Sequence, residues 1–583
     1  MELAAPPTPD STPLAHVDAA LAALAAQKTA WARLAIDRKL ALLDGLRTRV
    51  DAAAGRWVTA SSRAKGLPVG SPLRGEEWAS GPWALLSYLD PLAATLRAAR
   101  DGTRAELMDG KVRQRPDGQT IVRVLPDGVY DHLLFSGLEV EVWQEPGVTP
   151  ASLPGTMATF YDERAPEGAV AVVLGAGNIA AIPPLDVLYK LYAEGQVCVL
   201  KMNPVNSYLG PVFEEVFAEF VEAGYVRFAY GGAEVGEHLT RHDLVDEVHV
   251  TGAASTHDAI VYGTGEDGAD RKERDAPVLH KRVTSELGGI SPCLVVPGDW
   301  SEPDLAFQAE HVATQKMHNG GFNCIASQVL VLPEAWRQRD AFVHSVRRVL
   351  RELPDRPAYY PGAEDRVAQV REAYPETAER LGPTGARTLV TNVDPDDDAH
   401  AFTAEFFGPA LATTSLPGGG PDEDPADWLD RAVDWCNDRL EGTLGMTILV
   451  HPKTAKAMGA RLEDAVARLR YGTIGVNVWS GIGFLIAQGA WGAFPGHERT
   501  DIQSGTGVVH NAYLFGKPQK TVLRGPFAPF PRSLLLGEAH AAPKPIWFVT
   551  NETAETTARR LTRFTAKPSP LGLPGIFASA LRG

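Results

Sequence analysis

The sequence has few cysteines and no long apolar run, and these absences exclude several classes of protein. The four cysteines, Cys198, Cys293, Cys324 and Cys436, lie far apart, and none belongs to a Cys-x-x-Cys pair. This spacing argues against a disulfide framework or a zinc site and is typical of a reducing compartment. The apolar runs fall short of the ~20 residues that a membrane helix needs, and the N-terminus has no secretory pattern. We therefore expect a cytoplasmic protein with no metal site and no membrane contact.

Basic side chains are also in deficit. The 56 lysines and arginines are outnumbered by 72 aspartates and glutamates, which gives a formal net charge of −16. Such a charge argues against nucleic acid or an anionic surface as a partner. Hydrophobic residues make up 44% and charged residues 22% of the chain, as in ordinary globular proteins. A chain of 583 residues is too long for one hydrophobic core, so two or three domains are expected.

The stretch at residues 318–327 has an unusual local composition around Cys324. Two glycines and two asparagines precede this cysteine, and an apolar run typical of a strand follows it. Glycine and asparagine allow a sharp turn, so a substrate could approach the thiol. The alternative is that Cys324 is a small buried hydrophobic residue, as many single cysteines are.

Two glutamates at turns accompany this cysteine. Glu286 lies 38 residues upstream and is followed by Leu-Gly-Gly, and Glu405 stands in Glu-Phe-Phe-Gly-Pro. A glutamate in a partly dry site can have its pKa raised toward neutrality, and it can then act as a general base. For Glu405 the alternative is a carboxylate that caps a helix or a turn.

Taken in order, the Glu-Leu-Gly-Gly, Gly-x-x-Cys and Glu-x-Phe-Gly-Pro motifs resemble those of the aldehyde dehydrogenase superfamily. The likeness runs from about residue 20 to about residue 525. It implies an α/β protein with two doubly wound α/β domains, one for the cofactor and one for catalysis, and a small β oligomerisation element. The implied boundaries are 14–118 and 165–282 for the NAD(P)-binding domain, 283–487 for the catalytic domain, and 119–164 and 498–525 for oligomerisation strands. Residues 526–583 form an extension that the family does not usually have, and its role is unknown.

The resemblance implies the oxidation of an aldehyde to a carboxylic acid with NAD or NADP. Cys324 would form a thiohemiacetal and then a thioester, Asn178 and the Cys324 N–H would hold the oxyanion, and Glu286 would activate the deacylating water. The alternative is a CoA-acylating aldehyde dehydrogenase or acyl-CoA reductase, of which residues 201–204 are somewhat reminiscent. Glu286 argues against it, because hydrolysis needs a base there and acyl transfer to a thiol does not. A scaffold that has lost catalysis is the third reading.

The cofactor site has a partial signature in the sequence. Residues 175–180 follow an apolar strand and match Gly-x-Gly-x-x-Gly/Ala, but Lys201 stands where a dinucleotide fold usually has an acidic residue. The resemblance instead assigns Lys201 to the cofactor ribose. Other residues that it implies for cofactor binding are Asn203, Gly231, Gly232, Thr251, Gly252, Ser255, Glu405 and Phe407. Pro204 replaces an acidic residue of many NAD-preferring relatives, so NADP+ should be accepted at least as well as NAD+.

The remaining segments are interpreted from composition and periodicity. Alternating strands and helices at 168–255 predict a doubly wound parallel sheet, and two helices are expected within 14–64. Residues 156–163 are interpreted as extended, 264–276 as a surface loop, and 361–398 as an exposed connection. Trp479 and Phe484 lie in a loop that lines the aldehyde entrance in the family, which suggests an apolar aldehyde, although core packing explains them equally well. A homo-oligomer, dimer or tetramer, is implied by the family.

Overall fold

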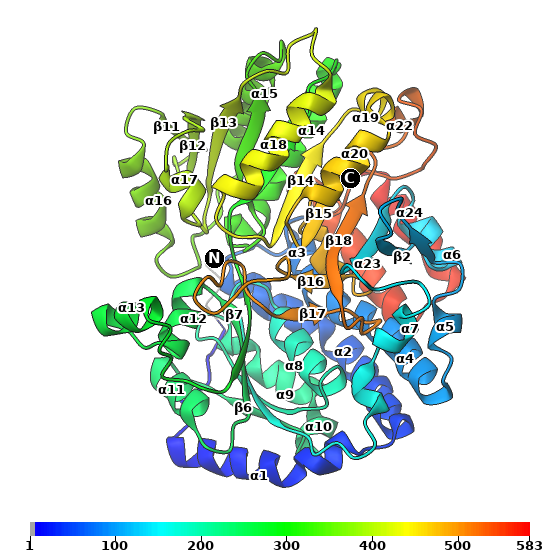
Figure 1. The fold of residues 1–583 in the computed structure, drawn as a ribbon, viewed down its shortest axis with the longest axis vertical. Helices are drawn as coiled ribbons and strands as arrows, with labels where there is room; N and C mark the ends of the chain where they lie inside the picture. Colours follow the sequence, from blue (N-terminus) through cyan, green and yellow to red (C-terminus); the bar gives the residue numbers. More distant parts are fainter. Residues whose placement is uncertain (1–5) are drawn as a thin grey trace.

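The computed structural model describes residues 6–583, and two sheets dominate it (Figure 1). The smaller sheet is parallel and has the strand order β6-β5-β4-β7-β8. Its strands are β4 (Val170–Leu174), β5 (Val197–Lys201), β6 (Val226–Ala229), β7 (Glu247–Gly252) and β8 (Arg282–Leu287). Helices follow the first four strands, which confirms the predicted doubly wound arrangement.

Helices cover this smaller sheet. Those within or after its crossovers are α8 (Ile182–Tyr192), α9 (Gly210–Val216), α10 (Ala218–Glu222), α11 (Ala233–Arg241), α12 (Ala254–Val261) and α13 (Gly265–Glu273). Of the two N-terminal helices, α1 (Leu14–Ala32) packs against strands of this sheet and runs along the lower border in Figure 1, whereas α2 (Ile36–Ala64) packs against α9 and α10. Apolar strands such as Val170–Leu174 are buried between these layers, as expected for a parallel sheet covered on both faces.

The larger sheet has eleven strands in the order β1-β2-β3-β18-β15-β14-β9-β10-β13-β12-β11. The seven strands from β18 to β12 run parallel, and antiparallel strands flank them at both ends. Their bounds are β1 (Val112–Gln114), β2 (Thr120–Leu125), β3 (Glu139–Gln144), β9 (Ser291–Val295), β10 (Ser327–Pro333), β11 (Ala378–Leu381), β12 (Arg387–Val393), β13 (Ala410–Leu416), β14 (Gly445–Leu449), β15 (Thr473–Val476) and β18 (Pro518–Arg524). Its helices are α14 (Glu302–Met317), α15 (Arg339–Glu352), α16 (Ala363–Ala373), α17 (His400–Thr403), α18 (Pro425–Arg439), α19 (Pro452–Met458) and α20 (Ala460–Arg468).

The remaining elements join the two sheets and cover their sides. They are α3 (Arg74–Trp78), η1 (Ala79–Trp83), α4 (Ala84–Asp101), α5 (Arg104–Leu107), α6 (Val129–Leu134), α7 (Leu153–Thr156), α21 (Ile482–Leu485), β16 (Ala490–Gly492), β17 (Val508–His510), α22 (Arg532–Leu535), α23 (Ala554–Ala566) and α24 (Leu573–Ala580). Helix α23 packs against α3 and η1, so the C-terminal extension is part of the folded body (Figure 1).

The assignment of β2, β3 and β18 to oligomerisation stays a prediction; within this chain they pair in the order β2-β3-β18, and β18 also pairs with β15 of the catalytic sheet. One predicted domain boundary differs from the structure. Strand β8, placed in the catalytic domain by the boundary at residue 283, pairs with β7 and completes the cofactor sheet. Assembly into a homo-oligomer stays a prediction.

Three segments were assigned the wrong local structure. Residues 156–163 contain the 3₁₀ turn Thr159–Asp162 instead of an extended run. The segment 264–276 contains α13, and 361–398 contains α16, β11 and β12. Within residues 6–583, no helix is long and apolar enough to cross a membrane.

Candidate active site

A cleft of about 800 Å³ lies where the two sheets meet, and most of the candidate residues line it. Asn178 follows β4, Lys201 ends β5, Thr251 belongs to β7 and Glu286 belongs to β8. Because parallel strands end at a common edge, these four positions converge there. Cys324 reaches the same cleft from the turn before β10.

The Cys324 turn follows directly from helix α14. Ser301 and Asp304 form a capping box at the start of this helix. After Met317 the chain turns through Asn319 (φ 55°) and Gly321 (φ 88°), both in the left-handed region. A Cβ atom on Gly321 would lie 2.6 Å from the Gly408 oxygen, so only glycine fits there. The sharp turn that the sequence predicted is therefore present.

The sulfur of Cys324 lies 3.8 Å from Oε1 of Glu286. Burial, reinforced by the charges of Asp186 and Glu405, raises the pKa of Glu286 to about 8. Its Oε2 is buried without a hydrogen-bond partner. Burial, together with Glu286 and Glu405, also raises the pKa of the Cys324 thiol well above its ordinary value and outweighs a backbone interaction that lowers it. The thiol thus faces a carboxyl group that can accept its proton only when that group is itself deprotonated, a state that its raised pKa favours above about pH 8.

Asn178 has one side-chain donor engaged and one to spare. Its Nδ2 donates to the Phe322 carbonyl at 3.0 Å, and an amide NH₂ has a second N–H. The main-chain oxygen of Asn178 accepts bonds from Lys65 Nζ at 3.1 Å, Asn319 Nδ2 at 3.1 Å and the Tyr359 hydroxyl at 3.2 Å. Three segments of the chain, those of Lys65, of the turn at residues 319–322 and of Tyr359, therefore fix the loop on which Asn178 stands.

Lys65 itself belongs to a buried ion pair. Its Nζ lies 2.7 Å from Glu77 Oε1 and 2.9 Å from Asn319 Oδ1, and both members of the pair are at most 3% exposed. The neighbouring Glu76 accepts from the Asn319 amide at 3.1 Å and from Arg356 at 2.9 Å. None of these four supporting charges was identified from the sequence, because their partners lie far away along the chain.

Glu405 and Phe407 occupy the other wall of the cleft. Burial raises the pKa of Glu405 to about 8, opposed by the charges of Lys316 and Arg366. The missing side chain of Gly288 makes room for it, because a Cβ there would come within 2.3 Å of Glu405 Oε2. Arg366 Nε donates to the Phe407 carbonyl at 3.2 Å. Arg366 was missed because its segment was interpreted as an exposed connection.

The remaining predicted cofactor residues divide into two groups. Lys201, Asn203, Gly232, Thr251 and Gly252 line the cleft. Two others, Gly231 and Ser255, do not belong to the cleft lining, and their role in cofactor binding stays a prediction. Gly231 packs near Ser11, and Ser255 is exposed on α12, whereas Ala253 and Ala254 line the cleft in its place.

The cleft suits a dinucleotide in volume and in chemistry. Its volume lies within the range of about 300–1,000 Å³ usual for small-molecule sites. A Cβ atom on Gly177 would lie 2.8 Å from Asn203 Oδ1, so there is no room for a side chain at this position. The backbone of Gly177 itself therefore lines the cleft. Glu405 Oε1 is buried without a partner and could accept a bond from a ribose hydroxyl. Lys201 and Glu405 are the charged residues that would hold such a ligand.

The two aromatics predicted at the aldehyde entrance take different places. Trp479 lies beside the catalytic turn, since its Nε1 donates to the Ile325 oxygen at 3.2 Å. Phe484 instead packs against Trp491 and His510, with ring centroids 5.5 and 4.3 Å apart, so it is a core residue.

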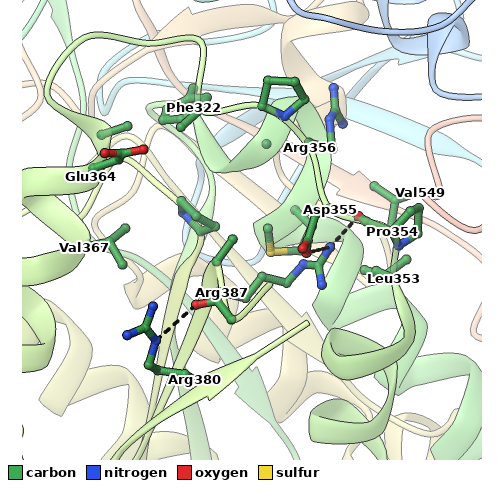
Figure 2. A pocket seen from close by; sticks show the side chains of 18 of the residues that line it. Phe322, Leu353, Pro354, Asp355, Arg356, Glu364, Val367, Arg380, Arg387 and Val549 are labelled. Atoms are coloured by element: carbon green, nitrogen blue, oxygen red, sulfur yellow. Dashed lines mark hydrogen bonds and ion pairs between the residues drawn. The ribbon is translucent and has the colours of Figure 1, made fainter. Parts of the chain in front are cut away.

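A second cavity, of about 390 Å³, lies near the same turn and is lined partly by Phe322 (Figure 2). The Phe322 ring lies 5.9 Å from the ring of Phe407 across the cleft wall. Arg387 points into this cavity, where it pairs with Asp355 at 3.1 Å (Figure 2). No cysteine lines the cavity, so its lining offers no thiol for covalent chemistry.

One group of side chains among residues 6–583 has the composition of a metal site: Asp18, His238 and His242. The Leu244 amide donates to His242 Nδ1 at 3.1 Å, which leaves the proton of the neutral ring on Nε2. Nε2 is the nitrogen that faces Asp18, at 3.5 Å. A metal ligand needs a lone pair at that position, so this contact favours a hydrogen bond to Asp18 over a metal ion.

Comparison with known proteins identifies similar chains. Residues 144–358 match the aldehyde dehydrogenase family model. A coniferyl aldehyde dehydrogenase from a Pseudomonas strain is 27% identical over 331 residues, which cover 53% of this chain and 64% of that relative. An N-succinylglutamate 5-semialdehyde dehydrogenase from Caulobacter vibrioides is 27% identical over 203 residues, which cover 35% of this chain and 39% of that relative. The chain thus matches less than two thirds of the length of either relative.

Solved structures share the fold over most of the chain. One is an NADP-dependent glyceraldehyde-3-phosphate dehydrogenase from Bacillus halodurans complexed with NADP, with a TM-score of 0.56 and 16% identity over 88% of this chain and 92% of the other. A second is a gamma-glutamyl-gamma-aminobutyraldehyde dehydrogenase from Burkholderia cenocepacia, with a TM-score of 0.56 and 21% identity over 87% of this chain and 88% of the other. These likenesses establish the α/β architecture.

Proposed function

The chain belongs to the aldehyde dehydrogenase superfamily, and we propose that it oxidises an aldehyde to a carboxylic acid with NAD+ or NADP+. The observation that carries the proposal is the 3.8 Å approach of the Cys324 sulfur to Glu286 Oε1 inside the shared cleft. A thiol with a base in reach is the arrangement that covalent catalysis by cysteine requires.

The chain's own residues account for the first half of the reaction. The Cys324 sulfur adds to the carbonyl carbon of the aldehyde, and the thiol proton passes to Glu286. The free N–H of Asn178 and the Cys324 amide hold the oxygen, and a good donor of this kind contributes about 2.7–4 kcal/mol in other acyl-transfer sites. NAD+ or NADP+, which Lys201 and Glu405 would hold in the cleft, would supply the acceptor for the hydride that leaves the same carbon, and this carbon would become the carbonyl carbon of a thioester.

Hydrolysis then completes the cycle. After releasing the thiol proton to solvent, Glu286 takes a proton from a water molecule as that water attacks the thioester carbonyl. The collapse of the adduct releases the carboxylic acid, and Glu286 returns the proton to the Cys324 sulfur. The buried and unpartnered Oε2 of Glu286 supports this role, since it can accept a bond from such a water. Transfer of the acyl group to CoA would not need a base that activates water. The free oxygen of Glu286 therefore favours hydrolysis over transfer to CoA.

The test is a product analysis. Purified protein is incubated with NAD+ or NADP+ and aldehydes of varied chain length, with and without CoA. We expect NAD(P)H and the free acid in equal amounts, without stimulation by CoA. The name of the Pseudomonas relative makes an aromatic aldehyde a suitable member of the panel. Acyl-CoA as the stoichiometric product would replace hydrolysis with acyl transfer, and the absence of NAD(P)H with every aldehyde would overturn the proposal.

A further inference from the structure

The second cavity, of about 390 Å³, is separate from the cofactor cleft, because none of the described residues lines both. Phe322 and Val367 belong to its buried apolar part. Ala358, Arg380 and Ala386 of the lining are exposed, so the cavity opens to solvent. Its volume lies within the range of about 300–1,000 Å³ usual for small-molecule sites, and a ligand can reach it without passing through the cleft.

Two arginines of the lining, Arg371 of α16 and Arg380 of β11, converge on one carbonyl group. Nη2 of Arg371 and Nε of Arg380 both donate to the Gly385 oxygen, at 2.9 and 3.4 Å. Nε of Arg371 also donates to Thr388 Oγ1 at 2.9 Å. These bonds hold the two guanidinium groups in place but use only part of the five N–H donors that each group carries.

No carboxylate of residues 6–583 pairs with either of these two positive charges. Burial and the charge of Arg380 lower the pKa of Arg371, and no nearby acidic side chain offsets this. Asp355, a carboxylate of the same lining, already pairs with Arg387 at 3.1 Å and accepts from the Thr384 amide at 2.7 Å. Two like charges that converge without a counter-charge repel each other, and a bound anion would relieve this repulsion.

The other charges of the lining lie elsewhere or are already matched. Arg356 donates to both carboxylate oxygens of Glu76, each at 2.9 Å. Glu364 is exposed, and Figure 2 shows it on the side of Phe322, away from Arg380. The cavity therefore has an electropositive end at the paired arginines and a buried apolar part that includes the Phe322 ring.

We propose that this cavity binds an organic anion, whose carboxylate or phosphate group lies between Arg371 and Arg380 and whose apolar body lies toward Phe322. Guanidinium groups match both kinds of anion, because their planar forks donate paired N–H bonds to carboxylate or phosphate oxygens. The inference goes beyond the proposed function, since the cavity contains no reacting thiol and shares no lining residue with the cleft.

The test is a calorimetric titration of the purified protein with 3-phenylpropionate and with phenyl phosphate. Two matched ligands are 3-phenylpropionamide, which keeps the ring without the charge, and acetate, which keeps the charge without the ring. We expect saturable binding of at least one phenyl anion with a Kd of about 1 mM or below. The amide and acetate should bind at least about tenfold more weakly. The ratio of the two phenyl anions' affinities shows which anionic group the site prefers.

Two variants locate the binding by different routes. Arg380→Gln should weaken it at least about tenfold, because a charged donor is lost. Ala386→Glu should weaken it as well, since the Ala386 oxygen lies 3.4 Å from Arg371 Nη2 and a carboxylate at this exposed position supplies an internal counter-charge. Arg348→Gln is the matched control, because Arg348 is exposed on α15 and does not line the cavity. All three are substitutions of exposed residues, so the Tm without ligand should stay within about 2 °C of wild type.

Weaker binding in Arg380→Gln and Ala386→Glu, with wild-type binding in Arg348→Gln, supports the proposed site. Binding that all three variants retain would place the anion elsewhere, for example near Cys324, and would overturn the proposal. Binding of the neutral amide as tightly as the acid would also overturn it, because the guanidinium charges would then play no part. The absence of saturable binding by either phenyl anion would overturn it directly. None of these measurements uses turnover, so their outcome does not depend on the proposed function.

Discussion

Nζ of Lys65 lies 3.1 Å from the main-chain oxygen of Asn178 and 2.7 Å from Oε1 of Glu77. A buried ion pair from the N-terminal helices thus supports the residue proposed to hold the oxyanion. Because both charges are removed from water, the buried pair stabilises the fold little more than two apolar side chains of similar size would. Removal of one partner, however, leaves the other charge buried without a counter-charge. Asn178 in turn loses one of the three donors to its carbonyl oxygen.

We expect Lys65→Met to lower the free energy of unfolding by about 3–5 kcal/mol, measured by urea denaturation. Lys65→Met combined with Glu77→Gln should recover part of this loss, because no charge is then left unpaired. Lys28→Met is the control: its pair with Asp246 is 3.0 Å long but partly exposed, and its loss should cost less than about 1 kcal/mol. Equal effects of the two single variants would contradict the support role.

The covalent role of Cys324 is tested by Cys324→Ala. Loss of a nucleophile typically costs several orders of magnitude in turnover, so we expect less than about a hundredth of wild-type activity. Cofactor binding, followed by fluorescence titration, should be nearly unchanged. Cys436→Ala is the matched control, since Cys436 is a buried thiol in α18 that does not line the cleft. Substantial residual turnover in Cys324→Ala would place the reacting centre elsewhere.

Glu286 should give the reaction a characteristic pH dependence. Its carboxyl group must be deprotonated to act as a base, and its pKa is raised to about 8. We therefore expect the deacylation rate to rise about tenfold per pH unit below 8 and to level off above it. Glu286→Gln should abolish this rise and slow both the formation of NAD(P)H and the release of the acid, because the same carboxylate accepts the thiol proton and the proton of the attacking water. A wild-type rate that is flat from pH 6 to 9, with hydrolysis shown to be rate-limiting, would exclude Glu286 as the base.

Local sequence signals predicted the smaller sheet well. The segment 168–255, predicted to alternate strands and helices, contains β4 to β7, because buried parallel strands have continuous apolar sequences that end at glycine or polar residues. Helix α13 was missed for the opposite reason. Its sequence is highly charged and has no apolar run. One of its contacts is the ion pair of Lys272 with Asp258 of α12, at 2.8 Å, which no local sequence pattern predicts.

The candidate site shows the same division between local and long-range information. Motifs located Cys324, Glu286 and Glu405. Beside Cys324 and Glu286 these motifs include Gly321 and Gly288, where the structure leaves no room for a side chain. Lys65 is 113 residues from Asn178 along the chain, and Arg356 pairs with Glu76 from a distant part of the sequence. Contacts of this range depend on the tertiary fold and leave no periodic or compositional trace in the sequence.

Cofactor choice depends on the charges around the ribose end of the cleft. Lys201 lines the cleft, and Asn203 Oδ1 is already engaged by the Val205 amide at 3.0 Å. No carboxylate stands at Pro204 to repel a 2′-phosphate, a repulsion worth about 1–3 kcal/mol of discrimination. We expect kcat/KM for NADP+ to equal or exceed that for NAD+ with one good aldehyde. A preference for NAD+ of more than about a hundredfold would show that other residues set the choice.

The burial of Lys39 should have a separate effect on the stability of the fold. It is fully buried, and its Nζ has no hydrogen-bond partner but lies 4.7 Å from the ring of Trp31 and 4.9 Å from that of Tyr161. Burial lowers its pKa from 10.5 to about 7. Between these values the unfolded chain binds a proton that the folded chain does not, so this lysine makes the free energy of unfolding rise with pH. The ring contacts favour the charged form and reduce the size of the effect.

We expect Lys39→Met to be more stable than wild type at pH 7 by about 1–4 kcal/mol, because an apolar side chain of similar length replaces a buried amine. The advantage should shrink as the pH rises from 7 to 10, because the free-energy cost of deprotonating the wild-type amine on folding then decreases. Urea denaturation at several pH values measures both quantities, with Lys28→Met as a control at a partly exposed lysine. An advantage that is constant from pH 7 to 10 would mean that Lys39 titrates alike in the folded and unfolded chains.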